Sequence, residues 1–222
     1  MTAVSRFVCL LCFTALAAVP GWCGYLYSSG TPAQPLEGPE ITVHEVAGAF
    51  QLGLGATISG FEFWSFEYAA PFGGYAGSIS WNLYRDSNGP GSSLYGGNVS
   101  GFQRENNGTF TVVGNQATLY RNIISISPFD LDAGNYWIGL MNGDGSSNVF
   151  SGFFWAESVS EVDHKSFTEV RSATWNYSGL NLAFQLNGQD ISPPTNTPEP
   201  ATAVFFAVGA FALAALQRRR TR

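Results

Sequence analysis

Apolar and polar side chains alternate with a period of two in several short stretches of this chain. In 78–85 the alternating apolar residues are Ile79, Trp81 and Leu83, and in 180–187 they are Leu180, Leu182, Phe184 and Leu186. This period is typical of strands that turn one face toward a core. Further strands, some of them apolar on both faces, are predicted at 41–47, 57–68, 109–113, 117–127, 136–141 and 149–156.

Clusters of glycine, asparagine and aspartate separate these stretches, and such residues tolerate positive φ angles or fix turns. About nine short strands without a helical period between them predict an all-β chain. We therefore expect a single antiparallel β-sandwich, jelly-roll-like, over residues 25–190. The turn clusters lie at 86–91, 106–108, 130–134 and 142–145.

Two segments of this region lack the alternation. Residues 28–40 contain three prolines and are expected to form a lead-in loop. Residues 157–178 are rich in charged side chains, which predicts a long loop or an irregular edge hairpin.

The N-terminus has the pattern of a secretory signal peptide. Arg6 supplies a positive charge, residues 7–19 are apolar except for Thr14, and small residues follow. We expect residues 1–24 to be this signal, with cleavage after Ala17 or nearer Gly24.

The C-terminus carries a second apolar run, 201–216, in which Thr202 is the only polar side chain. A helix of this length would measure about 24 Å, which is short for a hydrocarbon core of about 30 Å. Arginines after the run would stop transfer and stay on the cytoplasmic side. A transmembrane helix with an Arg-rich tail is therefore expected at 201–222, after a proline-rich stalk at 191–200. The arginines are Arg218, Arg219, Arg220 and Arg222.

The stalk ends in Pro198, Glu199 and Pro200, directly before the apolar run and the arginine cluster. This order of motif, helix and basic end resembles the PEP-CTERM sorting signal of Gram-negative bacteria, although Thr197 stands where that family often has valine. The resemblance implies export across the inner membrane and transient anchoring by the C-terminal helix. It also implies cleavage near the motif by an exosortase, and release to the cell surface or the exopolysaccharide matrix. An ordinary single-pass tail anchor is the alternative.

Charge and cysteine content agree with an exported body. Cys9 and Cys12 lie inside the expected signal and Cys23 at its edge, so the body has no disulfide. Between residues 25 and 190 there are fifteen acidic and five basic side chains, a net charge of minus ten. With so few and scattered cations, the body is not expected to bind nucleic acid.

Few residues could support catalysis. His44 and His164 are the only histidines, and no Gly-x-Ser-x-Gly motif occurs. A glycosidase needs two carboxylates across a cleft. Glu62 and Glu67 are candidates, but their five-residue spacing places them on opposite faces of a strand. We therefore expect no enzyme activity.

Oxygen-bearing side chains near two turns raise calcium as a low-ranking alternative. Neither cluster matches the twelve-residue calcium loop, and both suit ordinary turns, so no metal site is assigned and no cofactor is expected. The residues are Asp130 and Asp132, and Asn142, Asp144 and Asn148.

The aromatic content, 15% of the chain, points to carbohydrate binding, because flat rings stack on sugars. Most body tryptophans lie in alternating strands, where a core position is the default. Trp175 and Tyr177, in the polar region, are the candidate ligand-binding residues.

The first hypothesis is a non-catalytic surface or matrix protein, with the exosortase, the export machinery and extracellular polysaccharide as partners. The alternatives are a carbohydrate-binding module and a secreted glycan hydrolase.

Overall fold

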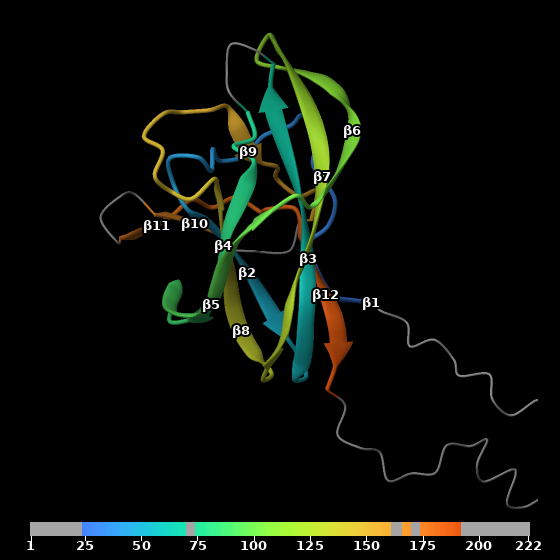
Figure 1. Ribbon diagram of the computed structural model, residues 1–222, viewed down its shortest axis with the longest axis vertical. Helices are drawn as coiled ribbons and strands as arrows, with labels where there is room; N and C mark the ends of the chain where they lie inside the picture. The colour runs from blue at the N-terminus through green and yellow to red at the C-terminus, as the bar shows by residue number, and fades with distance from the viewer. Residues whose placement is uncertain (1–23, 70–73, 161–165, 170–173, 192–222) are drawn as a thin grey trace, which may run out of the picture.

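The computed structural model describes residues 24–69, 74–160, 166–169 and 174–191. In these residues the regular secondary structure is β-strand, arranged in two antiparallel sheets that pack face to face (Figure 1). This confirms the all-β, sandwich-like architecture that the alternation predicts. In the same residues no helix is long and apolar enough to cross a membrane.

The first sheet, sheet 1, is built around the long strand β3, which pairs with β12 along its first half and with β9 near its end. The order of its main strands is β1, β12, β3, β7, β6. Their bounds are β1 Gly24–Ser28, β12 Phe184–Asp190, β3 Ala56–Tyr68, β7 Asn115–Leu131, β6 Gln103–Val112 and β9 Phe153–Trp155.

The second sheet, sheet 2, has the order β11, β10, β2, β8, β4, β5. Its centre is apolar on the inner face, and its two edges are the short β11 and the long β5. The bounds are β11 Trp175–Tyr177, β10 Ser166–Glu169, β2 Val46–Leu52, β8 Gly134–Asn142, β4 Ser78–Asp86 and β5 Pro90–Ser100.

The main core lies between the two sheets. Its residues alternate along the strands, as predicted for 78–85, where Ile79, Trp81 and Leu83 all point inward. Phe61 and Phe63 of β3 meet them from sheet 1. Burying one such side chain contributes about 1.5–3 kcal/mol, so a core of this kind stabilises the fold without disulfides.

A smaller core covers part of the outer face of sheet 1. Trp64 and Phe66 of β3 and Leu119 of β7 are buried there under Leu36 of the lead-in segment. That segment runs beside β9, and backbone hydrogen bonds such as Ala33 N to the carbonyl of Glu157, 2.8 Å, fix it in place. The predicted loop is therefore a packed strap.

Both ends of the sandwich leave from the same edge of sheet 1. β1 and β12 are antiparallel, and Gly24 pairs with Gly188 (Figure 1). The segments that precede and follow the sandwich therefore begin close together.

Some strand predictions match and others differ in their bounds. The strands at 57–68, 78–85 and 136–141 are confirmed within one or two residues. The strand predicted at 41–47 begins only at Val46, as β2, because the backbone N–H groups of Thr42 and Val43 donate to the Glu40 carboxylate and form a bend.

Other segments are shorter or longer than predicted. β9 covers only three residues of 149–156, and β12 begins at Phe184 instead of Leu180. β6 and β7 are longer than predicted, and β5 is a strand that the pattern does not reveal. In 157–178 the described residues form the β10–β11 hairpin at an edge of sheet 2, which confirms the edge-hairpin alternative. The predicted signal peptide and C-terminal helix lie outside the described residues, apart from Gly24.

Candidate functional site

The C-terminal half of β7 departs from its partner β3 in a wide bulge. The register shifts beside Ser59, so that three residues of β7, 126–128, lie opposite this single residue of β3. Pro128 has no backbone N–H and therefore suits a position without a ladder partner. The bulge bends β7 locally and changes the direction of its side chains.

The bulged part of β7 is also a free strand edge. β6 pairs with β7 only as far as Ile123. In sheet 2 the edge strand is β5, which pairs with β4 on one side. These two edges border one groove, which lies between β5 of sheet 2 and β7 of sheet 1. Unpaired edges present backbone N–H and C=O groups to any ligand that enters.

The groove has a volume of about 530 Å³. It is lined by Trp81 of β4, residues 95–99 of β5 and residues 125–129 of β7. The lining contains no acidic side chain, no basic side chain and no histidine. We call it the aromatic groove.

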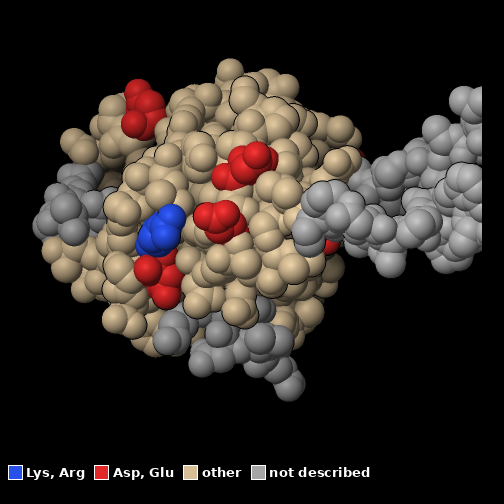
Figure 2. Space-filling model, turned by 90° about the horizontal axis from the view of Figure 1, so that it is seen from below, with Lys and Arg blue, Asp and Glu red and all other residues tan. Residues whose placement is uncertain are grey.

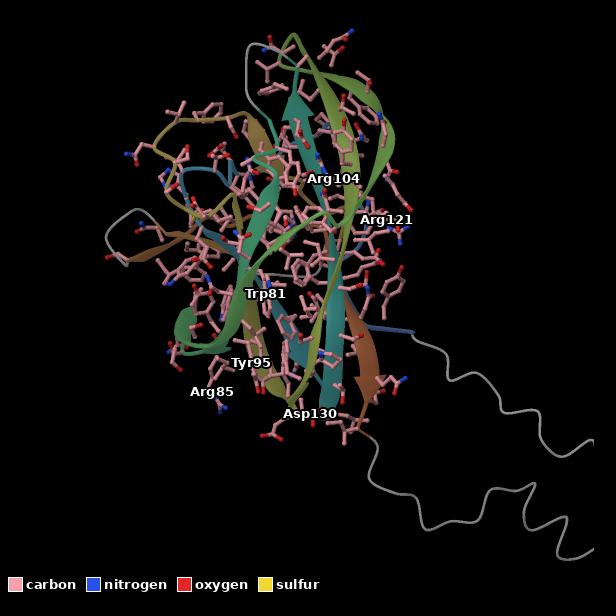
Figure 3. The ribbon with its side chains drawn as sticks, in the orientation of Figure 1. Trp81, Arg85, Tyr95, Arg104, Arg121 and Asp130 are labelled. Atoms are coloured by element: carbon pink, nitrogen blue, oxygen red, sulfur yellow. The ribbon has the colours of Figure 1, made fainter. Side chains whose placement is uncertain are left out.

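Three aromatic rings, those of Trp81, Tyr95 and Phe129, line the aromatic groove. Phe129 stacks on Tyr95, with ring centroids 4.1 Å apart, and lies parallel to Trp81 at 6.1 Å. Tyr95 is 40% exposed, whereas Trp81 is 8% exposed and rests on Phe61 of the core. Figure 3 shows Trp81 above Tyr95, both on the side of β4 and β5. The groove thus offers an exposed ring supported by a rigid stack.

The indole N–H of Trp81 is a donor at this site. Within the described part of the chain Nε1 of Trp81 has no hydrogen-bond acceptor, whereas Trp137 donates to Asp86 at 2.7 Å and Trp155 to the carbonyl of Ala183 at 3.0 Å. Nε1 lies beside Gly97, where an added Cβ would meet it at 3.3 Å. The lack of a side chain at this position keeps the donor uncovered on the β5 side.

Trp175 and Tyr177, the residues selected from sequence, lie on β11 at the opposite edge of sheet 2. Trp175 is half-buried and meets Tyr84 edge-on at 5.5 Å, although three strands separate β11 from β4 in the sheet. The β10–β11 hairpin therefore folds back over the outer face of the sheet. Tyr177 is 60% exposed and packs on Phe167. The structure does not bring this pair to the aromatic groove.

Glu62 and Glu67 lie on opposite faces of β3, as their spacing predicts. Glu62 pairs with Arg121, and Glu67 pairs with Arg104. The hydrogen bond to Glu62 raises the pKa of Arg121, and burial lowers the pKa of Arg104. Figure 3 shows both arginines above Trp81 and Tyr95. The two carboxylates do not face each other across a cleft, as a glycosidase pair must.

The other candidate residues occupy turns or structural positions. Asp130 is exposed and accepts a hydrogen bond from Thr57, and Asp144 accepts from Ser146, which lowers its pKa. Asn142 is fully buried and bonded to surrounding loops. The described residues hold no cluster of three or more His, Cys, Asp or Glu side chains suited to a metal.

Of the two histidines, His44 lies within the described residues and His164 does not. His44 is half-buried just before β2, and its Nδ1 atom is buried without a hydrogen-bond partner among the described residues. His164 and the sorting-signal residues Pro198, Glu199 and Pro200 lie outside the described residues, as do the four C-terminal arginines.

Sequence reasoning missed Tyr95, Phe129 and the bulge. One signal was present, because Pro128 inside an apolar-alternating strand is typical of an edge or a bulge. The contact of Tyr95 with Phe129 joins two sheets, and no local pattern predicts it.

Comparison of the chain with known protein families and with curated proteins gives no match. A functional assignment therefore depends on the geometry and chemistry of the site.

Proposed function

We propose that this protein is a non-catalytic, exported surface or matrix protein whose sandwich binds a neutral polysaccharide in the aromatic groove. The observation that carries the proposal is the ring stack of Trp81, Phe129 and Tyr95 between two free strand edges. The alternative on β11 has one exposed ring, Tyr177, while Trp175 is half-buried against Tyr84.

The groove supplies both kinds of contact that a sugar needs. The C–H face of a pyranose ring is apolar and stacks on an aromatic face, and Tyr95 offers such a face at 40% exposure. The hydroxyl groups need donors and acceptors. The Trp81 indole N–H, the hydroxyls of Ser125 and Ser127, and the free backbone edges can provide them.

The charge of the molecule favours a neutral ligand. No acidic or basic side chain lines the aromatic groove. The body carries fifteen acidic and five basic side chains, a net charge of minus ten, and this field repels polyanions such as uronic-acid polymers. Figure 2 shows one end of the sandwich, where acidic side chains outnumber basic ones.

Export is the part of the proposal that depends on the terminal segments. Residues 1–24 as a signal peptide and 191–222 as stalk, motif, helix and basic tail would direct the chain across the inner membrane. An exosortase would then release it. The jelly-roll-like strand order stays a prediction, because it is more specific than an arrangement of two antiparallel sheets.

The test is affinity electrophoresis of the full chain in a detergent without a sugar headgroup. The gels contain hydroxyethylcellulose, galactomannan or dextran as neutral polymers, and alginate or polygalacturonate as anionic ones. We expect retardation by at least one neutral polymer and none by the anionic polymers. No retardation by any neutral polymer would overturn the proposal.

A further inference from the structure

A second, polar pocket lies on the outer face of sheet 1, on the other side of β7 from the aromatic groove. Its volume is about 370 Å³. Ser125 lines both the pocket and the groove, so the two adjoin across one strand. The other lining residues are Tyr25, Ser59, Gly60, Glu62, Ile124 and Asn187.

Glu62 is the one charged residue of the lining, and it is held rigidly. The residue is 5% exposed, and its Oε2 atom accepts hydrogen bonds from Nε of Arg121 at 2.8 Å and pairs with Nη2 at 2.6 Å. Glu105, on β6, pairs with the same guanidinium: its Oε2 atom lies 3.2 Å from Nη1 of Arg121. The arginine therefore fixes the position of the Glu62 carboxylate and offsets part of the negative charge of the two glutamates.

The second oxygen of Glu62 is only weakly used. Oε1 has two contacts, both 3.4 Å long, with the hydroxyl of Tyr25 and the side-chain amide of Asn187. Hydrogen bonds to a carboxylate from O–H groups are normally about 2.5–2.7 Å long. This oxygen can therefore accept a stronger hydrogen bond from a ligand.

The remaining lining is rich in hydroxyl and amide groups. Tyr25 is 52% exposed at the rim, and Ser59 and Ser125 add two hydroxyls. Gly60 is buried, and a Cβ there would lie 2.5 Å from the carbonyl oxygen of Ile124, so this glycine lets β3 and β7 approach closely beside the pocket. An acceptor, an amide donor and several hydroxyls around a fixed carboxylate match the adjacent hydroxyl groups of a sugar.

We infer that this pocket is a second subsite, which binds adjacent hydroxyl groups on one sugar unit of the same neutral polysaccharide chain that lies in the aromatic groove. The inference rests on the proposed function. The chain crosses the bulge of β7, and Ser125 contacts it on both sides. The groove supplies ring stacking, and the pocket supplies selection by hydroxyl orientation.

The experiment compares two variants on one face of β12. Asn187→Ala removes an amide that lines the pocket, and Gln185→Ala removes an amide two residues away that does not. The full chain is tested in the gels with hydroxyethylcellulose, galactomannan and dextran, and Tyr95→Ala reports on the groove. We expect Asn187→Ala to weaken retardation about five- to tenfold and Gln185→Ala less than about twofold.

The outcomes separate the two claims. If the wild type is retarded and Tyr95→Ala is not, but Asn187→Ala behaves like Gln185→Ala, the subsite is wrong and the groove stands. If Tyr95→Ala is retarded like the wild type, or the wild type is not retarded, the proposed function fails and the subsite fails with it. Should Asn187→Ala unfold, Tyr25→Phe gives the decision, because it keeps the ring and removes a hydroxyl that contacts Glu62 at 3.4 Å and accepts a hydrogen bond from Arg121 at 3.1 Å. Unchanged retardation of Tyr25→Phe would then overturn the subsite.

Discussion

At the scale of single residues, two glycines make room for functional groups. Gly97 leaves the indole N–H of Trp81 uncovered at the groove. Gly139 of β8 lies under the carboxylate of Glu45, which is 6% exposed and accepts hydrogen bonds from Asn82 at 3.0 Å and Tyr84 at 2.9 Å. Tyr84 in turn supports Trp175 on the outer face of sheet 2.

Gly139→Ala tests this crowding. The new Cβ would lie 2.1 Å from Glu45 Oε1 and 3.0 Å from the Tyr84 ring, so both side chains must shift. We expect the free energy of unfolding to fall by about 1–3 kcal/mol, measured by urea denaturation. Gly53→Ala is the control, because an added Cβ meets nothing within 4 Å there. It should change the stability by less than about 0.5 kcal/mol. Equal losses in both variants would contradict the account.

Single residues were predictable from the sequence where burial follows a local period. Trp81 is placed inward by the alternation of its strand, and the structure confirms this. Phe129 and Tyr95 were not predictable, because their contact depends on a bulge and on the approach of two sheets.

At the scale of elements, the strap from residue 31 to 41 shows how tertiary contacts replace local propensity. It contains three prolines, yet its backbone is hydrogen-bonded to residues 153–159. Val159 N donates to the Thr31 carbonyl at 2.9 Å, and Glu157 N donates to the Glu37 carbonyl at 2.8 Å. The prolines predict a loop correctly, but the packing partner lies more than a hundred residues away. Strand β5 was missed for a related reason, since its glycine-rich sequence has no apolar period.

The strap brings Glu37 near Glu157. Partial burial of Glu157, and to a lesser extent the charge of Glu37, raises the pKa of Glu157 above its ordinary 4.5. A group with a raised folded-state pKa binds protons more readily in the folded state. Its contribution to stability is therefore present below the ordinary pKa and is lost as pH rises through the folded-state value.

Glu157→Gln should remove this pH dependence. Compared with the variant, the wild type should lose stability as the pH rises from about 4 to about 7, because the carboxyl must ionise beside Glu37 in a partly buried place. Thermal unfolding of both proteins across that range measures the difference. Parallel stability curves for the two proteins would contradict the explanation.

At the scale of the whole molecule, the all-β, sandwich-like architecture was predictable from alternation and turn clusters. The strand order was not, because pairing such as β3 with β12 depends on contacts far apart in the sequence. For the same reason the groove, which joins the edges of both sheets, has no sequence signature.

The proposed processing at the C-terminus gives a whole-molecule prediction. If Pro198-Glu199-Pro200 is a sorting signal, the exported protein should end near Glu199 in mass spectra. Replacing the three residues by alanine should leave membrane insertion intact, because the apolar run and arginines remain. It should also trap the full-length chain in the membrane. An exported wild-type chain that still reaches Arg222 would contradict this prediction and favour a plain tail anchor.

The central claim is that the aromatic groove, and not the β11 face, holds the polysaccharide. The most direct measurement compares the dissociation constants of Tyr95→Ala and Trp175→Ala for the neutral polymer that retards the wild type most strongly. We predict that Tyr95→Ala weakens binding about tenfold, equivalent to about 1.4 kcal/mol for the loss of one stacking ring, and that Trp175→Ala stays within about twofold of the wild type. Unchanged binding by Tyr95→Ala together with a large loss in Trp175→Ala would contradict the claim and place the ligand on the outer face of sheet 2.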